Sequence, residues 1–145
     1  MFRARHVCFA RPADEDIQRA ETILEKAKGR PLRGLDEVYA RETMFLKDYP
    51  SQVPLILQVI RIGDLGIAAI PCEVFAEIGL EIKQKSPFKP VFTIELANGC
   101  NGYLPTPAQH KLGGYETWRA RSSYLEVDAS TKIFDTLMEL FAKLR

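Results

Sequence analysis

One acidic residue stands at a point in the sequence where enzymes often place functional groups. Glu73 follows an apolar run at residues 65–70, and the pattern after it predicts a helix. Proteins that combine strands and helices carry functional side chains where a strand ends and the next helix begins. A carboxylate at such a place is able to ligate a metal or to act as an acid or base. The alternative is an ordinary carboxylate at a helix N-terminus, which interacts favourably with the helix dipole.

Two tyrosines each follow a glycine-rich turn in the second half of the sequence. Tyr103 comes after residues 98–102, Asn-Gly-Cys-Asn-Gly, and Tyr115 comes after a Gly-Gly pair. Glycine and asparagine let the backbone turn sharply, so we expect these turns to present the tyrosines to a cleft. The first turn lacks the Lys-Ser/Thr ending of a P-loop, which argues against phosphate binding. The alternative is that both rings simply pack, with their hydroxyl groups tethered.

Histidines and cysteines are too few and too scattered to complete a familiar catalytic site. The chain holds only two histidines, His6 and His110, so a histidine-rich site cannot be completed from it alone. Its three cysteines, Cys8, Cys72 and Cys100, form no Cys-X-X-Cys pair, which excludes a zinc ribbon and a thioredoxin motif. We expect them to be buried, reduced thiols. A small hydrolase that uses Cys100 or His110 is a minor alternative, because the sequence supplies no base for the thiol and places the histidine in a polar surface stretch.

The composition predicts a folded protein without a strong charge preference. The 145 residues include 46% hydrophobic and 27% charged ones, and 20 Lys and Arg against 19 Asp and Glu give a net charge of +1. A high apolar content with almost no net charge argues against disorder. The lack of a basic excess argues against nucleic acid as a partner. No apolar run reaches the roughly 18 residues that a membrane-spanning helix needs.

Periodicity and turn residues predict a mixed domain of strands and helices. A Gly-Asp turn at residues 63–64 between two apolar runs indicates a tight β-hairpin. Neither arm alternates cleanly between apolar and polar residues, so we expect a sheet covered on both faces. We interpret residues 1–145 as one α/β or α+β domain, a mixed sheet of about four strands packed with about four helices. The expected strands are residues 2–11, 53–62, 65–70 and 91–97, and the expected helices are 12–28, 35–48, 73–86 and 129–144, with a loop at 98–121.

Three motifs resemble the neutral (non-lysosomal) ceramidases, and more specifically their bacterial ceramidase-like relatives. They are residues 62–75 (IGDLGIAAIPCEVF), residues 97–106 (ANGCNGYLPT) and residues 113–116 (GGYE). The order of the motifs and the 12-residue step from Tyr103 to Tyr115 strengthen the resemblance. The similarity extends over most of the chain.

The resemblance implies a zinc amidohydrolase that cleaves the N-acyl bond of ceramide. In that family two histidines, a glutamate and a tyrosine hold the metal. By the matching motifs, Glu73 is similar to the glutamate ligand and Tyr103 to the tyrosine ligand. Tyr115 is similar to a tyrosine that stabilises the oxyanion formed when zinc-bound water attacks the amide carbon. This chemistry is consistent, since zinc lowers the pKa of its water to about 7 and a phenol meets the developing charge.

The family's histidine ligands, its general base and an arginine that recognises substrate lie in an earlier, larger part than the one matched. Neither His6 nor His110 falls in the family's histidine motifs. We therefore expect the C-terminal portion of a ceramidase-like catalytic domain, inactive alone, with the N-terminal portion and an N-acyl amide substrate as partners. A large exposed apolar patch would mark the surface where the missing part docks. The alternative is a non-catalytic structural or binding domain derived from that family.

Overall fold

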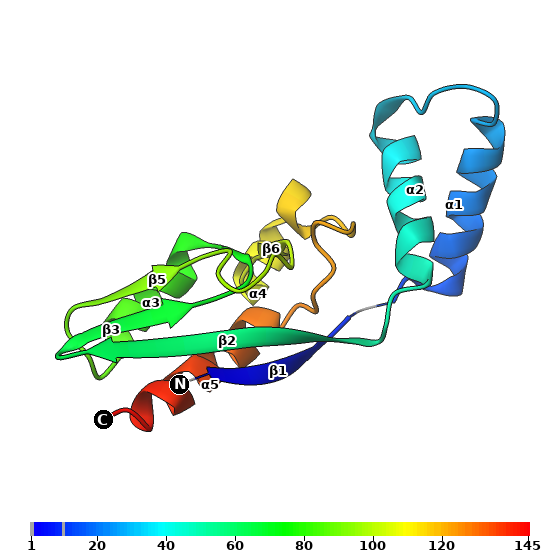
Figure 1. Ribbon diagram of the computed structural model, residues 1–145. Coiled ribbons are helices and arrows are strands. Elements are labelled where there is room, and N and C mark those ends of the chain that lie inside the picture. Colours follow the sequence, from blue (N-terminus) through cyan, green and yellow to red (C-terminus); the bar gives the residue numbers. More distant parts are fainter. Residues whose placement is uncertain (1, 10) are drawn as a thin grey trace.

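The central sheet is mixed, as the sequence predicts. The computed structural model describes residues 2–9 and 11–145. The four strands of the sheet are β1 (Phe2–Cys8), β2 (Gln52–Ile62), β3 (Leu65–Ala69) and β5 (Val91–Ile94). They pair in the order β1-β2-β3-β5 (Figure 1). β2 is antiparallel to both of its neighbours, whereas β3 and β5 are parallel.

The hairpin of β2 and β3 confirms the expected two-residue connection. Ile62 lies opposite Leu65 at the end of the ladder, and Gly63 adopts a φ of +59° in the turn. Glycine reaches this left-handed region without the clash that a Cβ would cause. The turn fixes the register, and therefore decides which side chains of β2 lie on each face of the sheet.

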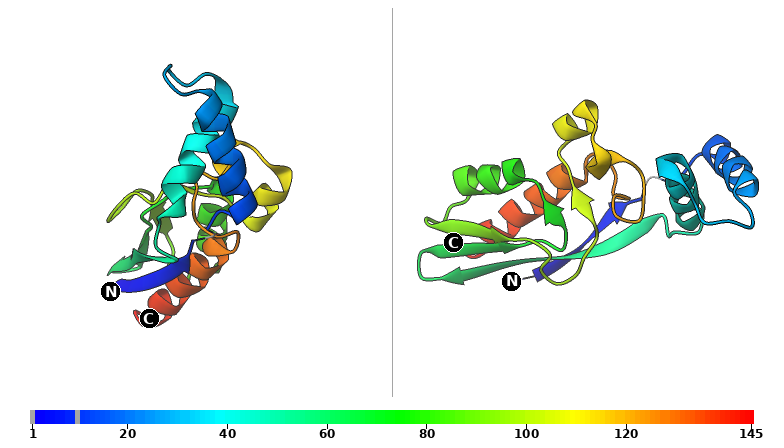
Figure 2. Two further views of the ribbon diagram at one scale, coloured as in Figure 1. Left: turned by 90° about the vertical axis from the view of Figure 1, so that its right-hand side faces the viewer. Right: turned by 90° about the horizontal axis from the view of Figure 1, so that it is seen from above.

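Two helices cover one face of the sheet and form the core with it. They are α3 (Ala76–Lys85) and α5 (Ala129–Ala142), which lie on the same side of the strands (Figure 2). At Gly66 a Cβ would lie 3.2 Å from the Phe141 ring, so the glycine lets α5 approach β3 closely. Buried core side chains come from both layers: Leu55, Leu57 and Val59 from β2, Ile78 and Ile82 from α3, and Ile133, Leu137 and Phe141 from α5.

The opposite face of the sheet is open, so the expectation of cover on both faces is wrong for the part of the chain that the structure describes. Leu57 and Val59 on β2 are fully buried, whereas Ile56 and Ile60 on the other face are exposed. Both helices of the core lie on the Leu57 side (Figure 2, right). Apolar residues on both faces of a strand do not say whether helices of the same chain cover both of them.

Two helices project from one end of the sheet as a hairpin (Figure 1). They are α1 (Asp14–Lys26) and α2 (Gly34–Lys47), which confirms both expected helices within about two residues at most ends. Ile17 and Ala20 of α1 are buried. Helical spacing places Leu35 and Phe45 among the buried positions of α2, yet both are exposed and Glu42 is buried instead. None of the described helices is long and apolar enough to cross a membrane.

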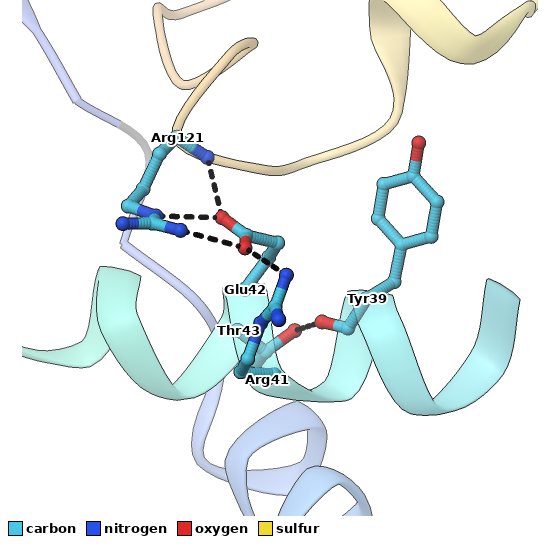
Figure 3. Close-up of polar contacts among 5 residues, drawn as sticks. All are labelled: Tyr39, Arg41, Glu42, Thr43 and Arg121. Atoms are coloured by element: carbon cyan, nitrogen blue, oxygen red, sulfur yellow. Dashed lines mark hydrogen bonds and ion pairs between the residues drawn. The ribbon is translucent and has the colours of Figure 1, made fainter. Parts of the chain in front are cut away.

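The buried Glu42 carboxylate anchors α2 to a distant segment of the chain. Arg121 donates to it from Nε at 2.8 Å and from Nη2 at 3.0 Å, and Arg41 donates at 3.2 Å (Figure 3). The Arg121 guanidinium also lies over the Phe45 ring, 4.1 Å from its centroid. The hydrogen bonds, above all those from Arg121, hold the pKa of Glu42 below its ordinary value although burial opposes this.

Short elements occupy the segments that the sequence predicts to be a helix start and a loop. They are β4 (Glu73–Val74), β6 (Tyr103–Leu104), α4 (Pro107–Leu112) and the 3-10 helix η1 (Tyr115–Thr117). The Thr106 hydroxyl accepts a hydrogen bond from the Gln109 N–H at 3.2 Å and caps α4. Elements of two to six residues are too short for periodicity to indicate them.

The variant Glu42→Gln is expected to lower the free energy of unfolding by about 1–3 kcal/mol at pH 7, because Arg121 then faces a neutral partner. The pKa of Glu42 is lowered in the folded state. The stabilisation by ionised Glu42 is therefore fully present above its pKa in the unfolded chain, about 4.3. It disappears as the pH falls through its lower pKa in the folded protein. Urea unfolding of both proteins at pH 7 and near pH 3 measures the difference.

The matched control is Glu25→Gln, which removes an exposed carboxylate 3.2 Å from Lys28. It is expected to change stability by less than about 0.5 kcal/mol. Equal losses in the two variants, or a Glu42→Gln effect that does not shrink in acid, would contradict the anchoring role.

Candidate functional site

Glu73 and Tyr103 lie opposite each other in a two-stranded parallel ladder. β4 pairs with β6, with Glu73 facing Tyr103 and Val74 facing Leu104. The Glu73 N–H donates to the carbonyl oxygen of Gly102 at 2.9 Å. Neighbouring strands are about 4.8 Å apart, and facing residues project to the same side. The ladder therefore brings together the two residues that the sequence motifs predict to share a site.

Glu73 does not lie in the first turn of a helix, and the expectation that it does is wrong. The helix α3 begins at Ala76, and Phe75 before it is extended, with φ −63° and ψ 142°. The N–H of Val74 donates to the Glu95 carboxylate at 3.0 Å. Backbone pairing to β6, rather than the dipole of α3, therefore places the half-buried Glu73.

Asn101 holds the glycine-rich turn against the residues that precede Glu73. Its backbone N–H and its Nδ2 both donate to the carbonyl oxygen of Pro71, at 2.8 and 3.0 Å. Its Oδ1 accepts a hydrogen bond from the Tyr124 hydroxyl at 2.8 Å. Neither Asn101 nor Tyr124 is predicted from the sequence to be a site residue. The asparagine inside the Asn-Gly-Cys-Asn-Gly turn was the available signal, because such side chains often bond to nearby backbone.

Gly102 is required by a close approach of two backbone segments. A Cβ on Gly102 would lie 2.2 Å from the carbonyl oxygen of Ser122, and its φ is +72°. The same Ser122 oxygen accepts a hydrogen bond from the Tyr103 N–H at 2.8 Å. The contact therefore fixes β6 between β4 on one side and the segment around Ser122 on the other.

Tyr115 brings a second phenol to Tyr103. Their ring centroids are 5.6 Å apart and the rings are nearly perpendicular, at 85°. Tyr115 is 56% exposed, whereas Tyr103 is half-buried. The Thr117 hydroxyl donates to the carbonyl oxygen of Gly114 at 2.7 Å, which stabilises η1 where Tyr115 begins it. The three predicted site residues thus form one group, with the Tyr115 side accessible to solvent.

The Tyr103 phenol is neutral at physiological pH. A side-chain hydrogen bond with Tyr115 is the main cause that raises the pKa of Tyr103 to about 12, followed by burial and by the negative charge of Glu73. Glu116 adds a further negative charge nearby. These groups favour a proton or another cation at the phenol. A bound cation would favour the phenolate instead.

The oxygen donors present suit part of a metal site. Glu73 offers a carboxylate and Tyr103 a phenol. Zinc sites in proteins use three or four protein ligands. Among the described residues, no group of three or more His, Cys, Asp and Glu side chains could hold a metal ion.

Among the described side chains, His110, Cys72 and Cys100 belong to no group of three or more metal-ligating residues. His110 lies in α4 and is half-buried rather than on the surface, and burial, followed by the charge of Arg119, lowers its pKa. Cys72 is buried, which raises the pKa of its thiol to about 12, so it is a poor nucleophile. Cys100 is exposed, contrary to the expectation of a buried thiol. The side chains of His6 and Cys8 lie outside the described residues.

Two solved structures have the fold of this chain. No protein-family model and no curated protein sequence matches it. A ceramidase solved in complex with C2 matches 83% of the chain with a TM-score of 0.54 and 18% identity. Neutral ceramidase from Pseudomonas aeruginosa matches 99% of it with a TM-score of 0.55 and 17% identity. The resemblance predicted from the sequence is confirmed at the level of the fold. The chain spans 21% and 28% of the lengths of these two proteins.

The variant Gly102→Ala is expected to destabilise the protein more than the same replacement at a glycine that has a similar positive φ but no close neighbours. Gly29 provides that control, because its φ is +81° and nothing lies within 4 Å of the added Cβ. Gly29→Ala should cost about 1–2 kcal/mol from the left-handed backbone alone. Gly102→Ala should cost at least about 1–3 kcal/mol more, because Ser122 must move.

Urea unfolding of the two variants measures this difference. In addition, an NMR shift of the Tyr103 amide in Gly102→Ala would report the displaced hydrogen bond to Ser122. Equal losses of stability in the two variants would show that the close approach is not a constraint.

Proposed function

We propose that residues 1–145 form the part of a ceramidase-type amidohydrolase that supplies Glu73, Tyr103 and Tyr115 to the active site. The observation that carries this proposal is the β4–β6 ladder, in which Glu73 faces Tyr103 while the Tyr115 ring contacts Tyr103. The fold shared with two ceramidases supports it. The sequence motifs that resemble neutral ceramidases contain the same three residues, which supports it independently.

Glu73 and Tyr103 would hold the metal, for which zinc is the ion that the resemblance implies. When bound, zinc supplies Lewis-acid polarisation and lowers the pKa of water to about 7. Glu73 contributes a carboxylate oxygen, and Tyr103 contributes a phenolate oxygen after it has lost its proton. With a pKa raised to about 12, Tyr103 keeps that proton when no cation is present. Binding a metal through this residue therefore releases a proton.

Tyr115 would stabilise the negative charge that develops on the substrate. Its side chain is 56% exposed beside Tyr103, so a substrate can reach its hydroxyl. A phenol that donates a hydrogen bond to the amide oxygen stabilises the transition state more than the ground state. A single donor of this kind typically contributes about 10²–10³-fold to the rate.

The substrate class that we propose is an N-acyl amide such as ceramide. Two solved proteins that share this fold are ceramidases, one of them solved in complex with C2. The reaction would break the amide C–N bond and add the elements of water, leaving a carboxylic acid and an amine. Because the described residues gather no group of three or more His, Cys, Asp and Glu metal ligands, we propose that the chain is inactive until another portion supplies the missing ones.

Zinc titration of the isolated chain by calorimetry is expected to show weak binding, with a Kd on the order of 0.1 mM or weaker. Complete four-ligand sites bind zinc with about 10–16 kcal/mol, and two oxygen donors supply only part of this. Affinity should rise with pH between about 6.5 and 7.5, approaching tenfold per unit, because Tyr103 is protonated in the free protein. Titrations in buffers of different ionisation enthalpy should report the released proton.

Glu73→Gln and Tyr103→Phe should each abolish this binding. The matched control is Glu77→Gln, since the exposed Glu77 carboxylate instead accepts a hydrogen bond from Gln109 at 2.9 Å. Hydrolysis of a short-chain ceramide by the isolated chain is not expected. Tight stoichiometric zinc binding or turnover would mean that the site is complete here. Binding that survives both substitutions would favour a non-catalytic domain that keeps only the fold.

A further inference from the structure

The open face of the sheet carries a continuous apolar surface. We call it the outer face and define it by the exposed side chains Ile56, Ile60, Ile62, Phe92 and Ile94, which surround the buried Ile67. The strand register places Ile60, Ile67 and Phe92 in one row across β2, β3 and β5. Ala69 and Ile94 form the next row with Gln58. The surface is therefore a set of neighbouring side chains rather than scattered exposed residues.

The outer face is unlike the solvated side of an ordinary antiparallel sheet. Such a side usually carries polar residues at alternate positions. Here Ile60 is 38%, Phe92 is 41% and Ile94 is 43% exposed. On this face, residues 56–62 of β2 and the described strands β3 and β5 carry one polar side chain, that of Gln58. Contiguous exposed apolar patches of this kind mark interaction sites.

The accessible surface of the chain is larger than its mass predicts. A compact monomer of 16.4 kDa should expose about 7,500 Å². The chain exposes 8438 Å². The excess of about 900 Å² reflects a shape less compact than that of a typical monomer of this mass. The projecting α1–α2 hairpin contributes to this excess (Figure 2).

The outer face reaches the end of the sheet from which the chain continues to Glu73. The N–H of Ile70 donates to the carbonyl oxygen of Ile94 at 3.0 Å, at the end where β3 leads to Glu73. Just beyond, the Asn98 side chain lies 3.4 Å from that of Gln58, which ties the glycine-rich turn to the outer face. A polypeptide that covers the outer face would therefore extend to the end of the sheet where Glu73 and Tyr103 lie.

We infer that the outer face is the docking surface for the remaining portion of a ceramidase-type catalytic domain. This inference rests on the proposed function, which requires further metal ligands from such a portion. The fold of this chain makes up only 21% and 28% of the two solved ceramidases, so in those proteins most of the polypeptide lies outside the shared fold. The partner surface must be apolar and nearly uncharged, as the outer face is.

The binding test uses Pseudomonas aeruginosa neutral ceramidase from which the region matched by this chain has been deleted. Biolayer interferometry should detect binding of the wild-type chain to this truncated enzyme. The double variant Ile60→Glu/Phe92→Glu should bind at least tenfold more weakly. Leu80→Glu is the control, because Leu80 is 63% exposed on α3, in the layer that covers the other face of the sheet. Absence of binding, or equal loss in the control, overturns the inference.

Two further measurements cover the other outcomes. If the truncated enzyme does not fold, superposition of this chain on the intact Pseudomonas aeruginosa structure tests whether the rest of that enzyme covers the outer face. Positions that match Ile60, Phe92 and Ile94 must be buried by the rest of that chain, and their exposure to solvent overturns the inference. Sedimentation velocity of the isolated chain tests whether a second copy of the chain covers the outer face instead. A dimer that the double variant dissociates also overturns it.

The proposed metal site and the proposed docking surface can be contradicted independently of each other. Weak zinc binding that depends on Glu73 and Tyr103 does not involve the outer face. If that binding is found while docking is absent, only the docking surface is wrong. If docking is found while Glu73→Gln leaves zinc binding unchanged, the metal site is wrong and the interface stands.

Discussion

The arrangement of the candidate site depends on one backbone contact, that between Gly102 and Ser122. Gly102 accepts a hydrogen bond from Glu73 through its carbonyl oxygen, and the next residue, Tyr103, donates to Ser122. A Cβ at Gly102 would occupy the space of the Ser122 carbonyl. Three segments far apart in sequence therefore meet only because this residue has no side chain. Asn101 adds the lateral support that keeps the turn against Pro71.

Much of the fold could be predicted from the sequence because its signals are local. The Gly63 turn between two apolar runs specifies the β2–β3 hairpin, and helical spacing specifies α1, α2 and α5. The grouping of Glu73 with Tyr103 could be expected from their motifs, but the ladder that joins them could not, because β4 and β6 contain two residues each. Burial of Glu42 also escaped prediction, since its partner Arg121 lies 79 residues away. Such pairings depend on tertiary structure, which outweighs local preference.

The proposals for the candidate site and for the outer face make the same requirement. Glu73 and Tyr103 provide oxygen donors without the nitrogen ligands that the ceramidase resemblance implies. In the part of the chain that the structure describes, the sheet provides an apolar layer with helices on one side. Under the proposed function, one polypeptide partner would complete both the metal coordination and the packing. The inner core does not need that partner, because α3 and α5 already bury Leu57 and Val59 completely.

The helical hairpin is inserted between two strands that pair with each other. β1 ends at Cys8 and β2 begins at Gln52, and the two residues are partners in the ladder. Closing a disordered loop of that length carries an entropic cost that grows with its logarithm. The α1–α2 hairpin forms from local contacts, and local contacts form early in folding. Once formed, it returns the chain to its starting point and holds Cys8 near Gln52. A folded insertion shortens the loop that strand pairing has to close, so the folding rate should depend on the helices more than the long separation in sequence suggests.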